Sequence, residues 1–399
     1  MKPLAICGLI LCVLLIPFSS RGDRIFFGDL HNHTAYSDGL GTAADAYEYA
    51  RDTAKLDFLA ITDHNHAQAE QGAKGDRKDG KMIGLDHALY TDGTVAVAEA
   101  VNKKFEGRFV ALYGQEFSSI KKGNHANVFD ISEVITVPNG RYDELIGDWL
   151  RQRPDSQGLP ALIQFNHPDG PQNNEYGGNG TAPDADWLEA MDKHAQLIEV
   201  ICGPALSDSE NGRCERTCEA QFLAYLNMGF HLAPTSGQDD HLARWGNVTD
   251  ARTAVIAPAL NKADILDALR NRHVYATEDK DLEVIFTAAG HLMGTCVNPP
   301  PPKNTHIPIE LTIQDEDEPF AEYQIELFAD TVGGKTARVI DVRSVTGNEH
   351  ADTPLIIEDV VYTGRNQYFF VKITQSIDDA PDDRVWTAPV WFEKTRRAT

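Results

Sequence analysis

Short apolar segments recur along residues 24–277 and alternate with longer segments that have the periodicity of amphipathic helices. The apolar segments are rich in β-branched and aromatic residues, so each is predicted to be a strand. They cover residues 24–30, 57–62, 108–115, 126–131, 161–166, 197–202 and 230–235. Helices are expected over residues 43–55, 95–105, 142–151, 185–194, 215–228 and 262–270. This alternation predicts an α/β domain with a parallel sheet, arranged as a barrel.

The pattern changes near residue 281, where helical periodicity ends. Ile307, Ile309, Leu311 and Ile313 alternate with polar residues, and turn residues recur at short intervals. Alternation with a period of two predicts antiparallel strands that bury one face. We therefore expect a first domain over residues 23–280 and a small antiparallel β-sandwich over residues 281–399. The acidic run at residues 315–318 lacks the EF-hand spacing and is expected to be a solvated turn of this sandwich.

Residues 1–22 have the features of a signal peptide. Lys2 precedes an apolar run that is shorter than the roughly 20 residues needed to span a bilayer. No A-x-A cleavage site is present, and an uncleaved anchor is the alternative. The predicted location is periplasmic or secreted, where disulfides can form. Three pairings are open to the four cysteines that would remain: Cys202, Cys214, Cys218 and Cys296.

The balance of charge limits the choice of partners. The chain has 60 acidic residues against 36 Lys and Arg, for a net charge of −24. Such a chain is not expected to bind a nucleic-acid polymer or an anionic membrane surface. No segment after the apolar N-terminal run is long and apolar enough to span a membrane, so no membrane association is expected once that run is cleaved.

Side chains that bind metal ions follow most of the predicted strands at their carboxyl ends, the face at which such barrels carry active sites. Residues i and i+2 of an extended chain project to the same side. His31 with His33, and Asp239 with His241, could therefore each bind one ion. The candidate ligands are His31, His33, Asp38, His64, Glu116, His125, His167, Asp239 and His241. Imidazoles and carboxylates without thiolates suit Zn, Mn or Fe. Nine ligands exceed the needs of one ion, so two or three metal ions with bridging carboxylates are expected.

These motifs, in this order, resemble those of the PHP (polymerase and histidinol phosphatase) superfamily. They are H-x-H-T-x-x-S-D-G, D-F-L-A-I-T-D-H-N, G-x-E, H-A-N, N-H-P and S-G-x-D-x-H, and together they extend over residues 24–280. The H-A-N strand and the segments at 270–277 and 289–295 are similar to the carbaryl-hydrolase-like (CehA/McbA) branch. The resemblance implies a distorted (β/α)7 barrel followed by a β-sandwich.

The resemblance also implies a role for each ligand. His31 and His33 would hold a first metal, and Glu116 would bridge it to a second metal on His125 and His167. His64 and Asp38 would serve a third metal, and Asp239 and His241 would complete the cluster. Asp240 replaces a small serine of the family motif and could compete as a ligand.

The expected function is an exported, metal-dependent phosphoesterase that acts on a small-molecule ester. A hydroxide bridging two metals would attack phosphorus in line. Asp63 is expected to orient an imidazole, while Arg244 and His66 are candidate contacts for the substrate anion. A carbamate or carboxylic ester hydrolase on the same cluster is the first alternative. The second is a non-catalytic surface protein whose sandwich binds a glycan or a partner.

Overall fold

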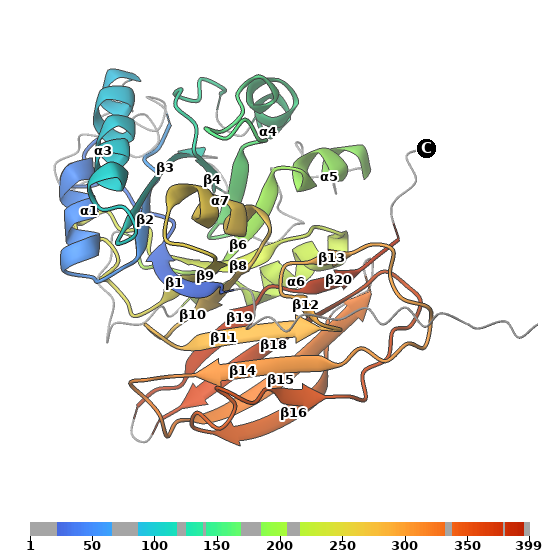
Figure 1. Ribbon diagram of the computed structural model, residues 1–399. Coiled ribbons are helices and arrows are strands. Elements are labelled where there is room, and N and C mark those ends of the chain that lie inside the picture. The colour runs from blue at the N-terminus through green and yellow to red at the C-terminus, as the bar shows by residue number, and fades with distance from the viewer. Residues whose placement is uncertain are drawn as a thin grey trace, which may run out of the picture.

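The computed structural model describes residues 22–65, 87–117, 125–138, 141–168, 185–205, 216–331, 337–377 and 380–394. The predicted signal peptide, except for Gly22, lies outside this part of the chain, as do His66 and Cys214. The described residues form a mixed α/β structure in which helices surround the upper part of a large sheet and strands alone build the lower part (Figure 1). Within these ranges no helix is long and apolar enough to cross a membrane.

The large sheet contains every strand described between residues 24 and 257. They are β1 (Arg24–Asp29), β2 (Phe58–Ile61), β3 (Val110–Phe117), β4 (His125–Phe129), β5 (Leu162–Asn166), β6 (Ala195–Cys202), β7 (Arg216–Thr217), β8 (Ala233–Gly237) and β9 (Arg252–Ala257). β1, β2 and β3 run parallel, and so do β5, β6 and β8. β4 is antiparallel to both β3 and β5, and β9 is antiparallel to β1. The predicted parallel pairing is therefore found in part, because β4 and β9 make the sheet a mixed one.

One side chain joins β8 to β9. The described residues of these two strands share no backbone ladder. The Thr253 hydroxyl accepts from the Ser236 backbone N–H at 2.9 Å and donates to the Ser236 carbonyl at 2.8 Å. Here a threonine hydroxyl supplies the hydrogen bonds that a backbone ladder supplies between the other neighbouring strands.

The helices are α1 (Ala43–Asp52), α3 (Ala96–Lys104), α4 (Tyr142–Glu144), α5 (Ala185–Asp192), α6 (Glu219–Met228) and α7 (Lys262–Arg270). Thr42 begins α1 with a capping box to Asp45, and Asn261 caps α7 through its side chain. Gly229 ends α6 in the left-handed conformation, with φ 103°. The expected regular helix over 142–151 is broken into α4, a wide turn at Leu145–Trp149 and a tight turn at Leu150–Gln152. Gly147 in its middle has a low helix propensity.

The C-terminal strands belong to two sheets. β11 (Glu283–Ala288), β12 (His291–Leu292), β14 (Ile309–Gln314) and β17 (Leu355–Ile357) form a separate four-stranded sheet. The others extend the large sheet: β13 (Cys296–Val297), β15 (Glu322–Thr331), β16 (Arg338–Thr346), β18 (Gln367–Ser376), β19 (Asp383–Thr387) and β20 (Val390–Phe392). Phe286 and Leu311 from the small sheet share a buried cluster with Ile325 and Ile373 from the large one. The two sheets therefore pack face to face (Figure 1).

The large sheet continues across the predicted domain boundary. β10 (Val274–Thr277) lies between β9 and β19, antiparallel to both. Trp386 of β19 pairs with Ala276 of β10 and is fully buried, and its Nε1 donates to Glu219 Oε2 of α6 at 3.0 Å. Trp386 thus joins the C-terminal strands to a helix and a strand of the N-terminal half.

The described cysteines do not form a disulfide in this structure. Cys202 at the end of β6 and Cys218 before α6 are buried, and their Sγ atoms are 2.9 Å apart. Cys296 is exposed. Of the three pairings left open by the sequence, only one joins these two neighbouring thiols.

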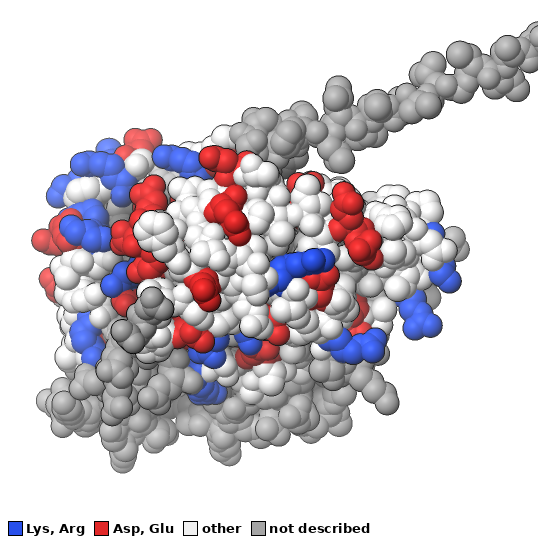
Figure 2. Space-filling view, turned by 90° about the horizontal axis from the view of Figure 1, so that it is seen from below, with Lys and Arg blue, Asp and Glu red and all other residues white. Residues whose placement is uncertain are grey.

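The surface in Figure 2 bears acidic and basic side chains interspersed with one another. The net charge of −24 is thus not gathered into one acidic patch on this face.

We predict that Trp386→Ala lowers the free energy of unfolding by about 3–5 kcal/mol, because it empties a large buried volume and removes a hydrogen bond to Glu219. Urea unfolding followed by circular dichroism would measure it. Phe320→Ala is the control, since Phe320 is 87% exposed and its removal should change stability by less than about 0.5 kcal/mol. Equal effects of the two substitutions would contradict the role given to Trp386.

Candidate metal centre

The nine predicted ligands lie together at one edge of the large sheet. His31 and His33 follow β1, His64 follows β2, and Asp239 follows β8. His125 is the first residue of β4 rather than a residue that follows a strand. Because β4 is antiparallel to its neighbours, its amino end meets their carboxyl ends at the same edge. The reversal of β4 therefore brings His125 to the site.

Backbone pairing extends past the strands and fixes the ligands in place. Glu116 N–H donates to the Asp63 carbonyl at 3.1 Å, which sets His64 beside Glu116. His33 N–H donates to the Asp240 carbonyl at 3.0 Å, and Asp239 N–H donates to the His31 carbonyl at 2.9 Å. Two of the ligands, His167 and Asp239, have positive φ values of 28° and 52°. Non-glycine residues adopt this backbone rarely, and it is typical of functional sites.

The buried carboxylate of Glu116 lies at the centre of the cluster. Its Oε1 is 3.2 Å from His31 Nε2, 3.0 Å from His125 Nδ1 and 3.4 Å from His167 Nε2. Its Oε2 is 3.3 Å from His33 Nε2 and 3.1 Å from His64 Nδ1. Both oxygens are thus shared among imidazoles from several strands, as a carboxylate that bridges two metal ions requires.

Asp239 completes a group around the first pair of histidines. Its Oδ1 is 3.2 Å from His31 Nε2 and 3.1 Å from His33 Nε2, and the two Nε2 atoms are 3.3 Å apart. A metal with bonds of about 2.0–2.1 Å to tetrahedral ligands places those ligands about 3.3 Å from one another. The spacing of these donors is therefore that of ligands around one ion.

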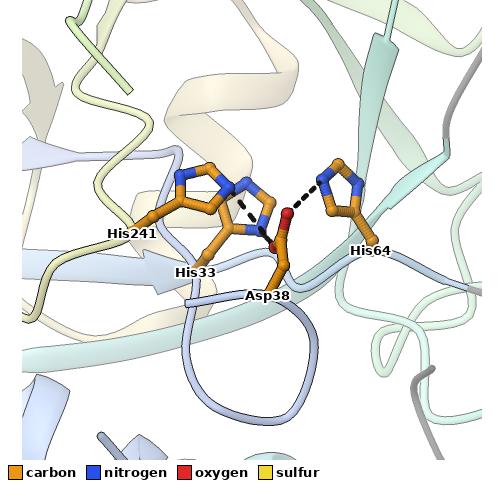
Figure 3. Close-up of side chains that lie close together, drawn as sticks. All are labelled: His33, Asp38, His64 and His241. Atoms are coloured by element: carbon orange, nitrogen blue, oxygen red, sulfur yellow. Dashed lines mark ion pairs between the residues drawn. The ribbon is translucent and has the colours of Figure 1, made fainter. Parts of the chain in front are cut away.

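A second group surrounds Asp38 (Figure 3). Its Oδ1 is 3.3 Å from His241 Nε2 and 3.6 Å from His33 Nδ1, and its Oδ2 is 3.5 Å from His64 Nε2. His64 also belongs to a third group with Glu116 and His125. The three groups overlap at His33, His64 and Glu116, so the donors form one continuous cluster.

Hydrogen bonds away from the cluster set the orientation of two imidazoles. His31 Nδ1 is 2.7 Å from Glu199 Oε1, and His241 Nδ1 is 2.7 Å from the Asp239 carbonyl. A proton on each Nδ1 leaves the Nε2 lone pair directed at the cluster, which is how metal-bound histidines are commonly held. Glu199 also accepts from Gln164 Nε2 at 3.2 Å and from the His167 backbone N–H at 2.5 Å. Glu199 is not among the residues predicted from the sequence, because it lies inside an apolar strand segment.

Gly237 leaves room for this carboxylate. A Cβ at residue 237 would lie 2.0 Å from Glu199 Oε1 and 2.9 Å from His31 Cβ. A side chain here would therefore displace both Glu199 and His31.

Asp63 acts on a backbone segment rather than on an imidazole directly. Its Oδ1 accepts from the Thr34 N–H at 2.8 Å and from the Ser37 hydroxyl at 2.6 Å, and its Oδ2 accepts from the Thr34 hydroxyl at 2.7 Å. Ser37 Oγ is in turn 3.4 Å from His33 Nδ1. Asp63 thus holds the turn that carries Asp38 and reaches His33 only through Ser37.

Asp240 and Arg244 pair with each other. Arg244 Nε donates to Asp240 Oδ1 at 3.2 Å, and the Arg244 backbone N–H donates to Asp240 Oδ2 at 2.6 Å. The expectation that Asp240 competes as a ligand was wrong, because its buried carboxylate is bound to residue 244. His66, the other predicted substrate contact, lies outside the described residues.

Arg216 is a cation at the rim of the cluster that sequence reasoning missed. It is an exposed residue of β7, and its Nη2 donates to the carbonyl of His167 at 3.4 Å. Only the pairing of β7 with the end of β6 brings it beside His167, so no motif in the sequence marks it.

Burial and mutual attraction shift the pKa values of the cluster in opposite directions. Burial favours the neutral forms, yet His31, His125 and His64 hold the pKa of Glu116 well below its usual range. Burial likewise opposes charge on His64 and His241, but neighbouring carboxylates outweigh it and raise their pKa values to about 10 and about 9. At His125 burial prevails, and its pKa is lowered.

This donor set fits divalent transition metals. It combines six imidazoles with three carboxylates and has no thiolate, which suits Zn, Mn or Fe. Neighbouring carboxylates outweigh burial at His31 and His64 and raise their pKa values, which favours the protonated forms of these two imidazoles. Metal ions would replace those protons, because an imidazole must be deprotonated to bind a metal.

Comparisons with known proteins give distant likenesses only. No protein-family model matches the sequence, and a comparison with curated proteins gives no match. A two-domain protein of Bacteroides vulgatus ATCC 8482, described as containing a predicted PHP-like metal-dependent phosphoesterase, is 14% identical, with 88% of this chain and 91% of that chain covered and a TM-score of 0.46. A candidate metal-dependent phosphoesterase of Bifidobacterium adolescentis ATCC 15703 is also 14% identical, covering 60% of this chain and 94% of its own, with a TM-score of 0.31. TM-scores this low carry no argument about function, so the function has to be inferred from the cluster and from the sequence motifs.

We predict that Glu199→Gln weakens metal binding by about 10–100-fold, because the amide no longer holds His31 with a charged hydrogen bond. Titration of the chelator-treated protein with Mn²⁺ or Zn²⁺ in a calorimeter would measure the change. Glu189→Gln is the matched control, since that side chain is 62% exposed and pairs only with Lys193 among the described residues. Equal affinities of the two variants would rule out the positioning role of Glu199.

Proposed function

We propose that this protein is a metal-dependent hydrolase of the PHP superfamily that cleaves phosphate esters of small molecules. The proposal includes a distorted (β/α)7 barrel, a C-terminal β-sandwich and export by a signal peptide over residues 1–22. The observation that carries it is Glu116, whose two oxygens lie 3.0–3.4 Å from five imidazoles. A buried carboxylate shared in this way has a direct use as a bridge between ions.

The candidate ligands would be divided among two or three ions. His31, His33, Asp239 and Glu116 would hold one ion, and His64, Glu116, His125 and His167 a second, with Asp38 and His241 available to a third. When bound, such ions supply Lewis acidity and lower the pKa of water to near neutrality. Glu199 and Asp63 keep the ligand geometry fixed, so little reorganisation is needed during the reaction.

The position of Arg216 favours a phosphate ester over a neutral substrate. Its Nη2 donates to the backbone carbonyl of His167, which places a cation close to one candidate ligand and suits the binding of an anion there. Arg244 is less suited to this task, because Asp240 already holds it. A carbamate or carboxylic ester hydrolase, as in the CehA/McbA branch, is the alternative in which Arg216 has no role in substrate binding.

The ligand set speaks against a non-catalytic surface protein. An enzyme that has degenerated into a non-catalytic protein has ordinarily lost at least one of its metal ligands. Here all nine donors converge, and residues around them supply orienting hydrogen bonds. Such support is expected where metal geometry has to be held for a reaction.

We expect the purified protein to hold two or three Mn, Zn or Fe ions per chain and to hydrolyse bis(p-nitrophenyl) phosphate. Glu116→Gln should lower both metal content and turnover, the latter by more than about 100-fold, because it removes the shared negative charge. Elemental analysis and an absorbance assay on the same sample measure the two effects. Glu322→Gln, an exposed substitution on β15, is the control and should leave both unchanged.

Failure to take up metal after reconstitution would overturn the hydrolase proposal and leave the surface-protein alternative. Metal uptake with turnover of an aryl carbamate or carboxylic ester alone would overturn the phosphoesterase proposal in favour of its first alternative.

Arg216→Ala should lower kcat/KM for the phosphodiester by about 10–100-fold, because a charge-assisted hydrogen bond to the substrate anion is lost. Metal content should be unaffected. Steady-state kinetics of the variant and of Arg338→Ala, an exposed arginine on β16, provide the comparison. A matching loss in both variants, or no loss in Arg216→Ala, would remove Arg216 from the substrate site.

A further inference from the structure

A second group of oxygen donors lies where the N-terminal half of the chain meets the small C-terminal sheet. Residues 278–282 connect β10 to β11, and residues 315–321 connect β14 to β15. Glu283 of β11 pairs with Gln314 of β14 in antiparallel register, so these two connections lie side by side. Asp279, Asp281 and Glu318 each offer an oxygen, and the three oxygens lie within 4.8 Å of one another.

Asp315 contradicts the expectation of a solvated acidic turn. Its side chain is fully buried, with Oδ1 accepting from the Glu318 N–H at 2.8 Å and Oδ2 accepting from Gln375 Nε2 at 2.7 Å. Asp279 is also buried, and its Oδ1 accepts from the Asp281 and Leu282 N–H groups at 2.8 Å each. Asp279 and Asp315 are therefore built into the structure, whereas Glu316 and Asp317 of the same run are exposed as expected.

No basic side chain among the described residues forms an ion pair with Asp279, Asp281, Asp315 or Glu318. Lys280 pairs with Asp250 at 2.8 Å, and Arg384 pairs with Glu278 at 2.6 Å. Burial and the charges of Asp279, Asp315 and Asp317 raise the pKa of Asp281 to about 6. Burial and Asp315 raise that of Glu318 to about 7. Within the described part of the chain, the crowding of these carboxyl groups is therefore not relieved by a basic side chain.

Among the described residues, two buried oxygens beside this cluster have no hydrogen-bond partner. Gln375 is fully buried and uses its Nε2 on Asp315, while its Oε1 has no partner. Tyr323, which is 1% exposed, faces Gln375 across β15 and β18, and its hydroxyl has no partner either. Burial and the charges of Asp315, Asp279 and Glu318 raise the pKa of the Tyr323 hydroxyl, which shows that it lies in the field of the cluster. Buried polar atoms are rarely left unpaired, so these two oxygens indicate that a ligand binds here.

We propose that this cluster binds one Ca²⁺ ion. All its donors are oxygens, which hard cations prefer and which distinguishes it from the imidazole-rich centre. Ca²⁺ takes six to eight oxygens at about 2.3–2.6 Å, so oxygens on opposite sides of the ion are up to about 5 Å apart. Mg²⁺ demands near-octahedral geometry at about 2.0–2.1 Å and keeps several waters, so carboxylates gathered from two connections suit the more adaptable shell of Ca²⁺ better.

The ion would join two connections that are far apart in sequence. Asp279 and Asp281 lead out of β10, the strand that lies between β9 and β19, while Glu318 leads into β15. Ca²⁺ bound to both would hold the small sheet against the large one. This role is structural and independent of hydrolysis at the other centre.

Calcium titration of the chelator-treated full chain tests the proposal. We expect one binding event in a calorimeter, with a dissociation constant below about 1 mM, and a rise of Tm on adding CaCl2. The double variant Asp281→Asn/Glu318→Gln should bind Ca²⁺ at least about tenfold more weakly and lose the rise of Tm. Glu316→Gln removes an exposed acidic side chain of the same run and should behave as wild type.

Further variants separate this site from the imidazole-rich centre. His64→Ala should keep the Ca²⁺ event, since it alters only the other cluster. Should the double variant fold poorly, Asp281→Asn alone should still weaken binding. No response of the wild type to CaCl2, an equal response to MgCl2, loss of the event in His64→Ala or its persistence in the double variant would each overturn the proposal.

Discussion

The carboxylate of Glu116 lies in the interior among the imidazoles of His31, His33, His64, His125 and His167. A buried carboxylate is costly unless positive charge or hydrogen bonds compensate it. Compensation here depends on five histidines that come from several strands of the large sheet. The negative charge of Glu116 is therefore compensated only if those strand ends are aligned. The positive charge comes from protons on the imidazoles or from metal ions bound to them.

The antiparallel direction of β4 also contributes to this cluster. In an all-parallel sheet, only residues that follow strands would reach the active edge. The reversal of β4 lets a residue that begins a strand reach it too, so His125 stands opposite His64 with ring centroids 5.5 Å apart. The gap between β8 and β9, bridged by Thr253, lies next to the segment that carries Asp239 and His241.

The two clusters differ in the ligands that they offer. The large one combines nitrogen and oxygen donors, whereas the one around Asp279 has oxygen donors alone. Ligand chemistry of this kind separates transition metals from calcium. One chain can therefore bind two classes of cation without competition between its sites, one at the active edge and one at the junction of its two sheets.

The sequence by itself indicated the alternation of strands and helices and the candidate donors that follow strands, because the period-two rule and strand-end placement are local properties. Only the tertiary structure decided the rest. Glu199 lies within an apolar run, and its role arises where β6 passes behind His31. Asp63 is adjacent to a ligand in sequence but turns toward Ser37, and Asp240 binds residue 244. The oxygen cluster joins residues 279 and 318, which no local spacing relates. Contacts of this kind depend on which strands become neighbours, and strand neighbours are set by packing across the whole chain.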